Sequence, residues 1–315
     1  MSYHFTIGYS GGIENLSKLL DFSSRIETVY TGGLKNKIAG GRPQYTETMS
    51  SIEEQVKYAK DRNIFFEIAL NTPCGVEERT NKSWWKDVKD YLKDLEMCGV
   101  DGIVVSHPFL LEEVASYTKM KIIVSTICEI TTVRSALYYE AMGAEVIIPS
   151  MNVNYNLDVL RDMKKNLKEA SLRIMVNEHC LGDCPWRRFH HSHYAHSNSE
   201  VDYHLHCKKV FMKYPERMLT NNVIRPEDIH NYFDITDDFK IVGRMVEMDV
   251  LLKQIKAYEE QKYEDNYVDL CDASLAPKIY IQNSGLSDLF EHKNKCDKVC
   301  ERCGYCKKLY DRYSK

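Results

Sequence analysis

The sequence has no excess of positive charge and no long apolar run, and we expect that its first residues are not a signal peptide. Its 315 residues carry 42 Lys and Arg against 46 Asp and Glu, a formal net charge of -4. A globally basic nucleic-acid-binding protein is therefore excluded, although a local basic groove stays possible. No apolar run reaches the roughly 18 residues of a membrane helix, and the start, MSYHFTIGYSGG, lacks the basic and apolar parts of a signal peptide. We expect a cytoplasmic protein with no membrane partner.

Motifs of nucleotide enzymes and common hydrolases are missing as well. The glycine pairs at 11–12, 32–33 and 40–41 do not fall in a GxGxxG or GxxxxGK frame. The sequence contains no HExxH motif and no recognisable Ser-His-Asp order. A peptidase needs an activated nucleophile or a hydrolytic metal, so these absences disfavour hydrolysis.

The pattern of apolar residues predicts an α/β protein. Short β-rich runs alternate with longer amphipathic stretches such as 51–62, 86–97 and 133–142. This alternation is typical of a parallel sheet with crossover helices. The predicted strands cover 5–9, 27–30, 64–70, 102–105, 121–125, 145–148, 172–176 and 239–242. About eight repeats favour a (β/α)8 TIM-type barrel, and a doubly wound open sheet is the alternative.

The regular alternation breaks after the seventh predicted strand. An insertion over 177–238 is too long for a plain crossover, and it holds three cysteines, a histidine cluster and several aromatics. Loops after barrel strands lie on the catalytic face, so we expect the chemistry there. We divide the chain into a barrel over 1–262 and a small C-terminal cysteine-rich, metal-binding extension over 263–315.

Cysteine is abundant, with 11 residues, and the strongest local motif is Cys296-x3-Cys300-x2-Cys303-x2-Cys306. Clustered thiols without a secretory signal indicate metal rather than disulfides. Both zinc and iron–sulfur clusters take four thiolates. The close run is more like a 4Fe–4S loop than the spaced CxxC pairs of a zinc knuckle. We predict a metal centre here, with a cluster favoured and zinc possible.

A second group of thiols, Cys180, Cys184 and Cys207, lies within the insertion. Three thiolates at the end of a barrel strand can hold three corners of a 4Fe–4S cubane, and Cys271 is the best-placed fourth ligand. A zinc site using Cys and His, or plain packing of these cysteines, is the alternative. The other candidates for the fourth ligand are His179, His206 and an exogenous molecule.

Imidazole and guanidinium groups accompany these thiols. The histidine patch comprises His190, His191, His193 and His196. Such a patch can bind metal or move protons, and we take His190 as its candidate catalytic member. Arg187 is a candidate to pair with an anionic substrate or with cluster charge. Arg244 ends the predicted closing strand, and we expect its side chain to point into the mouth of the barrel, at the catalytic face where Arg187 lies. A salt bridge to Glu67 is the alternative.

Five segments together resemble a known family. They are FFEIALNT (65–72), GVDGIVVSHP (99–108), KIIVSTICEITT (121–132), AMGAEVIIPS (141–150) and IRPEDIHNYFDITDDFKIVGR (224–244). Their order and spacing, over roughly 5–258, resemble peptidase family U32, the collagenase-like proteins. The resemblance implies a barrel and, in some members, a 4Fe–4S cluster on four cysteines. Cys180, Cys184 and Cys207 match three of these cysteines, and the fourth has no counterpart before Arg244.

The resemblance implies two kinds of activity. Some members are collagen-degrading peptidases, and others look like oxygen-independent hydroxylation or RNA-modification factors, in part working as pairs of related subunits. Together with the missing hydrolytic motifs, this favours an iron–sulfur enzyme acting on an RNA base or a small aromatic or anionic substrate. A U32-type peptidase and a non-catalytic electron-transfer or assembly subunit are the alternatives. The expected partner is a redox protein or a related U32 subunit.

Overall fold

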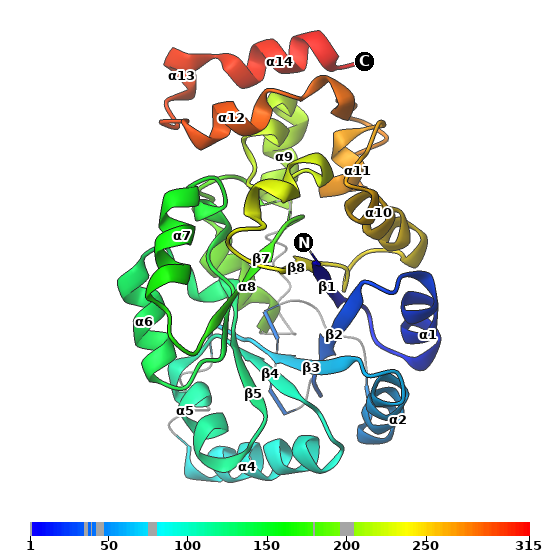
Figure 1. Cartoon of the computed structure of the whole chain (residues 1–315), viewed down its shortest axis with the longest axis vertical. Helices are drawn as coiled ribbons and strands as arrows, with labels where there is room; N and C mark the ends of the chain where they lie inside the picture. Colours follow the sequence, from blue (N-terminus) through cyan, green and yellow to red (C-terminus); the bar gives the residue numbers. More distant parts are fainter. Residues whose placement is uncertain are drawn as a thin grey trace.

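The computed structural model describes residues 2–34, 37–38, 40–41, 47–74, 81–178, 180–195 and 205–315. Eight parallel strands close into a barrel in sequential order (Figure 1). They are β1 (His4–Gly8), β2 (Ile26–Gly32), β3 (Phe65–Leu70), β4 (Gly102–Val105), β5 (Lys121–Val124), β6 (Val146–Ile147), β7 (Ser171–Met175) and β8 (Asp238–Ile241). Each predicted strand overlaps one of these. The barrel is therefore confirmed, and the open doubly wound sheet is wrong.

Helices follow the strands and surround the barrel (Figure 1). They are α1 (Ile13–Phe22), α2 (Met49–Lys60), α4 (Lys82–Met97), α5 (Pro108–Tyr117), α6 (Val133–Ala141), α7 (Leu157–Asn166), α8 (Arg187–Ala195), α9 (Leu205–Lys213), α10 (Met248–Glu260), α11 (Tyr267–Cys271), α12 (Leu289–Asn294), α13 (Cys300–Cys303) and α14 (Tyr305–Tyr313). Short 3-10 segments include η3 (Pro215–Thr220) and η4 (Pro226–Tyr232). None of the helices in the described ranges has the length and apolarity to cross a bilayer.

The amphipathic pattern of the outer helices explains how they pack. In α4 the buried side chains are Val88, Tyr91, Leu92 and Leu95, which recur at the spacing of one helical face. The helix begins after Asn81, whose side chain accepts a hydrogen bond from the Ser83 amide. The apolar faces of such helices and the outward side chains of the strands form the main hydrophobic core.

The barrel interior has a charged layer and an apolar layer. Successive side chains of a strand point to opposite faces, so Arg173 and Met175 of β7 both point inward, as do Glu67 and Ala69 of β3. Toward the amino-terminal ends of the strands, Arg173 binds Glu67 and Asp238. The apolar layer above it consists of Tyr30, Ala69, Val104, Ile123, Ile148, Met151 and Met175. The charged layer places an ion-pair network inside the barrel.

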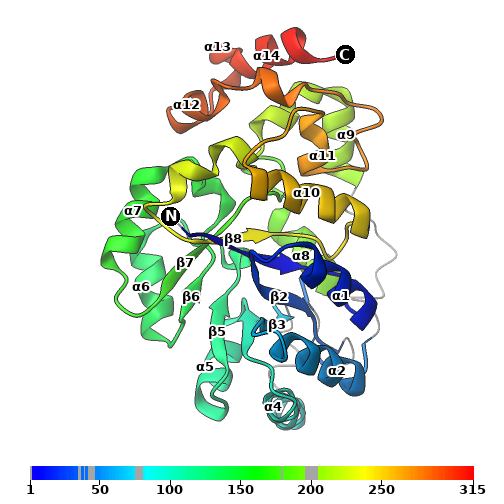
Figure 2. The same ribbon diagram turned by 45° about the vertical axis from the view of Figure 1, so that its right-hand side comes forward.

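The C-terminal extension packs against the insertion. Phe211, Met218 and Leu219 of the insertion share a second hydrophobic core with extension side chains such as Tyr267 and Leu309. Helices α12, α13 and α14 lie together at one end of the molecule, next to α9 and α11 (Figures 1 and 2). The boundary at 262/263 stays a prediction, but the extension and the insertion are joined by a common core.

Candidate functional site

Helix α8 brings a buried ion pair and a thiol together after strand β7. Nη1 of Arg187, the first residue of α8, lies 2.7 Å from Oε2 of Glu178 and donates to Sγ of Cys180 at 3.0 Å. Arg187 and Glu178 are both buried. Burial would lower the pKa of Arg187, but the negative charges of Glu178 and then Cys180 outweigh it and raise the pKa. A permanently charged guanidinium therefore lies against the Cys180 sulfur.

The second buried side chain of α8 connects this helix to the loops at the barrel mouth. His191 Nδ1 lies 2.9 Å from the Gly41 carbonyl oxygen. The Gly41 amide donates to Asn71 Oδ1 at 3.1 Å, and Asn71 Nδ2 donates to Ser125 Oγ at 3.2 Å. Asn71 and Ser125 directly follow β3 and β5, so α8 lies on the carboxyl-terminal face of the barrel, where barrel enzymes carry their active sites.

The histidine patch is therefore divided by depth. His191 is buried at the mouth, whereas the predicted catalytic residue, His190, is half-buried and stacks near Tyr194 with ring centroids 4.8 Å apart. His196 and His179 lie outside the described residues. Arg187 and His191 are four residues apart and share one helical face. A predicted helix at this position would have identified His191 as the inward residue.

Two cationic side chains contact the aromatic ring at the top of the barrel interior. The guanidinium carbon of Arg244 lies 5.6 Å from the centroid of the Tyr30 ring, and Nζ of Lys240 lies 3.7 Å from it. Both cations are buried. Glu67, the alternative partner of Arg244, is bound by Arg173 at 2.9 Å. Arg244 therefore points inward over Tyr30.

Lys240 is a candidate functional residue that the sequence analysis did not single out. Burial, and next the positive charge of Arg173, lower its pKa. The available signal was the alternation of Asp238 and Lys240 in the last strand, which places both charges on the inner face. The KIVGR ending also requires its glycine, because a Cβ at Gly243 would clash with the carbonyl oxygen of Gly8.

The four thiols predicted for the mouth divide into three environments. Cys180 contacts Arg187. Burial raises the pKa of Cys207, and the charge of the Cys184 thiol acts in the same direction. Cys271 is buried in the second core, where its Sγ accepts from Asn221 Nδ2 and donates to the Tyr267 carbonyl, both at 3.4 Å. The role of Cys271 as the fourth ligand stays a prediction.

The four tail thiols line one cavity of about 620 Å³ between the extension, the insertion and the loop after β6. They are Cys296, Cys300, Cys303 and Cys306. Burial raises the pKa of Cys306 to about 11, and the charges of the other three thiols act in the same direction. Sγ of Cys303 also lies 3.3 Å from Nε2 of His292. The four predicted tail thiols therefore line the same cavity.

None of these groups of thiols surrounds a common centre in the part of the chain that the structure describes. Among the described residues, no three His, Cys, Asp or Glu side chains are arranged to hold a single metal ion. A zinc ion with bonds of about 2.3 Å needs its sulfur ligands within about 4 Å of one another. A cubane binds each thiolate to a different iron, so its sulfur ligands stand further apart.

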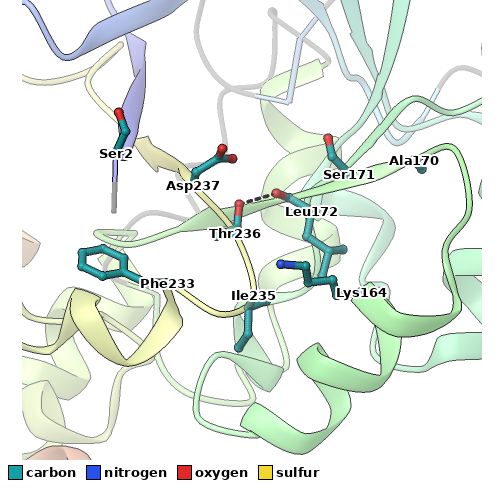
Figure 3. A pocket seen from close by; sticks show the side chains of 9 residues that line it. All are labelled: Ser2, Lys164, Ala170, Ser171, Leu172, Phe233, Ile235, Thr236 and Asp237. Atoms are coloured by element: carbon teal, nitrogen blue, oxygen red, sulfur yellow. Dashed lines mark hydrogen bonds between the residues drawn. The ribbon is translucent and has the colours of Figure 1, made fainter.

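Another cavity, of about 470 Å³, lies at the opposite end of the barrel (Figure 3). Its wall includes Ser2 before β1, Ser171 at the start of β7 and Asp237 before β8. Within it, Thr236 Oγ1 donates to the Leu172 carbonyl at 2.6 Å. The amino-terminal face of a barrel serves stability rather than chemistry. The candidate site is therefore the carboxyl-terminal face of the barrel beside helix α8, which we call the α8 mouth.

The fold and this mouth define a (β/α)8 barrel protein with a cysteine-bearing insertion over its carboxyl-terminal face. The chain belongs to peptidase family U32, whose family model matches residues 13–295. It is 27% identical to a Methanocaldococcus jannaschii protein named an uncharacterized protease, over 98% of each chain. A second protein with that description from the same organism is 21% identical over 78% of this chain and 61% of the relative.

The three-dimensional structure is similar to the solved structure of a U32 peptidase. The TM-score is 0.59 at 21% sequence identity, and the match covers 77% of this chain and 92% of the other. This likeness shows the fold.

Proposed function

We propose that this U32 protein is an iron–sulfur enzyme that modifies an RNA base or another small aromatic or anionic substrate at the α8 mouth, without using oxygen. The contact between Arg187 Nη1 and the Cys180 sulfur, at 3.0 Å, carries the proposal. Hydrogen bonds to ligand sulfur are one means by which a protein tunes a cluster. Glu178 fixes the guanidinium from its other side.

Three thiols are the candidate ligands of such a cluster by their chemistry and by their place in the chain. Cys180, Cys184 and Cys207 are half-buried thiols on the segments that follow β7, and soft thiolates are the ligands that iron–sulfur clusters take. These residues would hold the group, which supplies redox or Lewis-acid chemistry when bound. Its electrons would come from a redox partner or a related subunit.

The chain's own residues would then position the substrate. Arg244 and Lys240 place two cationic groups against Tyr30, and this local positive charge attracts an anion. The planar guanidinium of Arg244 suits bidentate contact with a phosphate or carboxylate. Helix α8, held by His191 and Arg187, covers the mouth and limits access of water.

A peptidase is the second candidate, because the relatives are named as proteases. A thiol peptidase needs a cysteine whose pKa is lowered. Burial instead raises the pKa of Cys128, after β5, to about 12. Cys128, at the carboxyl-terminal face of the barrel, is therefore a poor nucleophile.

The test is the iron and sulfide content of anaerobically purified variants. Cys184→Ser combined with Cys207→Ser should remove about four irons and four sulfides per chain. Cys98→Ser is the matched control, because Cys98 follows α4, outside the insertion that carries Cys184 and Cys207, and this variant should lose none. Equal iron in both variants would contradict the proposal.

A further inference from the structure

We propose that the four tail thiols hold a second 4Fe–4S cluster, separate from the mouth, and that the half-buried Lys293 is its charge partner. The cluster would lie at the interface between the C-terminal extension and the insertion, and it would stabilise their packing against each other. This inference rests on the tail cavity and stands independently of the reaction at the α8 mouth.

The tail backbone turns so that the thiols face one space. Cys300 and Cys303 lie on α13, and Cys306 lies in the first turn of α14. Between them Gly304 has a φ of +61°, a left-handed conformation that glycine adopts without strain. The reversal keeps Cys303 and Cys306 on the same cavity wall. Cys296 completes the set from the preceding loop, where its Sγ accepts from the Lys298 amide at 3.3 Å.

The opposite wall of the cavity comes from other parts of the chain. It includes Asn152 and Tyr155 after β6 and Thr220 of η3. Lys298 pairs with Asp183 at 2.8 Å, which joins the tail thiol loop to the residue before Cys184. Three of the four thiols are half-buried, Cys296 is exposed, and all four line a junction between the extension and the insertion.

Lys293 supplies a positive charge at this junction. Its Nζ lies 4.0 Å from the centroid of the Tyr155 ring and donates to the Asn221 carbonyl. Cys296 and Cys306 are among the groups whose charge acts on it. Four thiolates around a cluster leave a net negative charge, and a cation held close to that charge offsets it.

The volume of the site suits a cluster. The four thiols line a cavity of about 620 Å³. A cubane needs open volume between its four cysteine ligands, with one thiolate for each iron. A cavity walled by all four thiols provides that volume.

The experiment compares iron, acid-labile sulfide and zinc per chain after anaerobic purification of full-length variants. Cys300→Ser combined with Cys303→Ser should lose about four irons and four sulfides and keep the iron removed by changing Cys184 and Cys207. Limited proteolysis should release the tail of this variant sooner than that of the unmodified protein, because the cluster no longer stabilises the packing of the extension against the insertion.

Lys293→Met should keep the iron but shift the midpoint potential of the tail cluster to a more negative value, because the reduced cluster loses a nearby positive charge. Lys293→Arg, which keeps the charge, should retain the native potential. Lys295→Met is the matched control, since Lys295 lies in the same segment but is exposed, and its potential should equal that of the unmodified protein.

Unchanged iron and sulfide in the Cys300/Cys303 variant would overturn the tail cluster. Loss of one zinc ion and no iron would also overturn it. A potential unmoved by Lys293→Met would overturn the role of Lys293. If Cys300→Ser with Cys303→Ser loses no iron while Cys184→Ser with Cys207→Ser does, only the tail cluster is contradicted. If Cys184→Ser with Cys207→Ser loses no iron while the tail variant does, only the proposed function is contradicted.

Discussion

The buried arginine of β7 allows a quantitative test of the charged layer inside the barrel. Arg173 is 3% exposed, donates Nη1 to Glu67 Oε2 at 2.9 Å and donates Nε to Asp238 Oδ2 at 2.6 Å. Arg173→Met would leave both carboxylates inside the barrel without the cation that binds them. Removing one partner of a buried ion pair costs about 3–5 kcal/mol, and we expect a loss of unfolding free energy in this range.

A surface pair with the same contact distance provides the control. Arg161 Nε also lies 2.6 Å from a carboxylate oxygen, Oδ2 of Asp234, but these side chains are 45% and 52% exposed. Exposed pairs contribute about 0–1 kcal/mol, so Arg161→Met should have a small effect. The Arg173–Asp238 and Arg161–Asp234 contacts have the same length but differ in burial, and Arg173 binds Glu67 in addition.

Urea unfolding followed by circular dichroism measures both variants, with stability compared at unchanged denaturant slope. Adding Glu67→Gln to Arg173→Met should recover part of the loss, because the amide carries no charge to bury. A loss below about 1 kcal/mol for Arg173→Met, equal to that of Arg161→Met, would refute the reasoning.

Three further outcomes follow from the same structure. Burial would raise the pKa of Asp238, but Arg173 and His4 outweigh it and lower the pKa to about 2. The ionised Asp238 therefore stabilises the folded protein by roughly 2 kcal/mol at pH values above its unfolded pKa near 4, and this stabilisation is lost as the pH falls from about 4 to about 2. Acid unfolding of Asp238→Asn should lack this component, and an unchanged acid transition would contradict it. Arg244→Lys keeps the charge but loses the planar fork, so turnover should fall while iron content stays the same; unchanged turnover would remove Arg244 from substrate positioning. Gly243→Ala should destabilise the protein by about 1–3 kcal/mol, because its Cβ clashes with the β1 backbone, and a neutral effect in thermal unfolding would contradict that packing.

The barrel could be predicted from the sequence because its signals are local. Runs such as 102–105 and 121–125 are almost continuously apolar, as expected of strands buried on both faces, and their alternation with amphipathic stretches identifies the crossover helices. The inward charges of β8 follow from the same period of two. These features depend only on neighbouring residues.

The grouping of the thiols could not be predicted, because it depends on contacts between distant segments. Cys207 packs against the second core, which it shares with distant extension residues such as Tyr267. Cys271 matched the mouth by residue type, yet the packing of α11 against the insertion places it beside Asn221 in the second core. Spacing alone does not determine how a long insertion and an extension pack together.

The proposal of an iron–sulfur modification enzyme is tested most directly by one comparison. The anaerobically purified protein is analysed for iron, sulfide and its visible spectrum before and after reduction, and an iron-free preparation of the same chain is assayed for peptide cleavage. We predict a cluster spectrum that bleaches on reduction, about four irons for each cluster, and no peptide cleavage by the iron-free protein. Robust proteolysis by clean, iron-free protein would contradict the proposal and favour the peptidase.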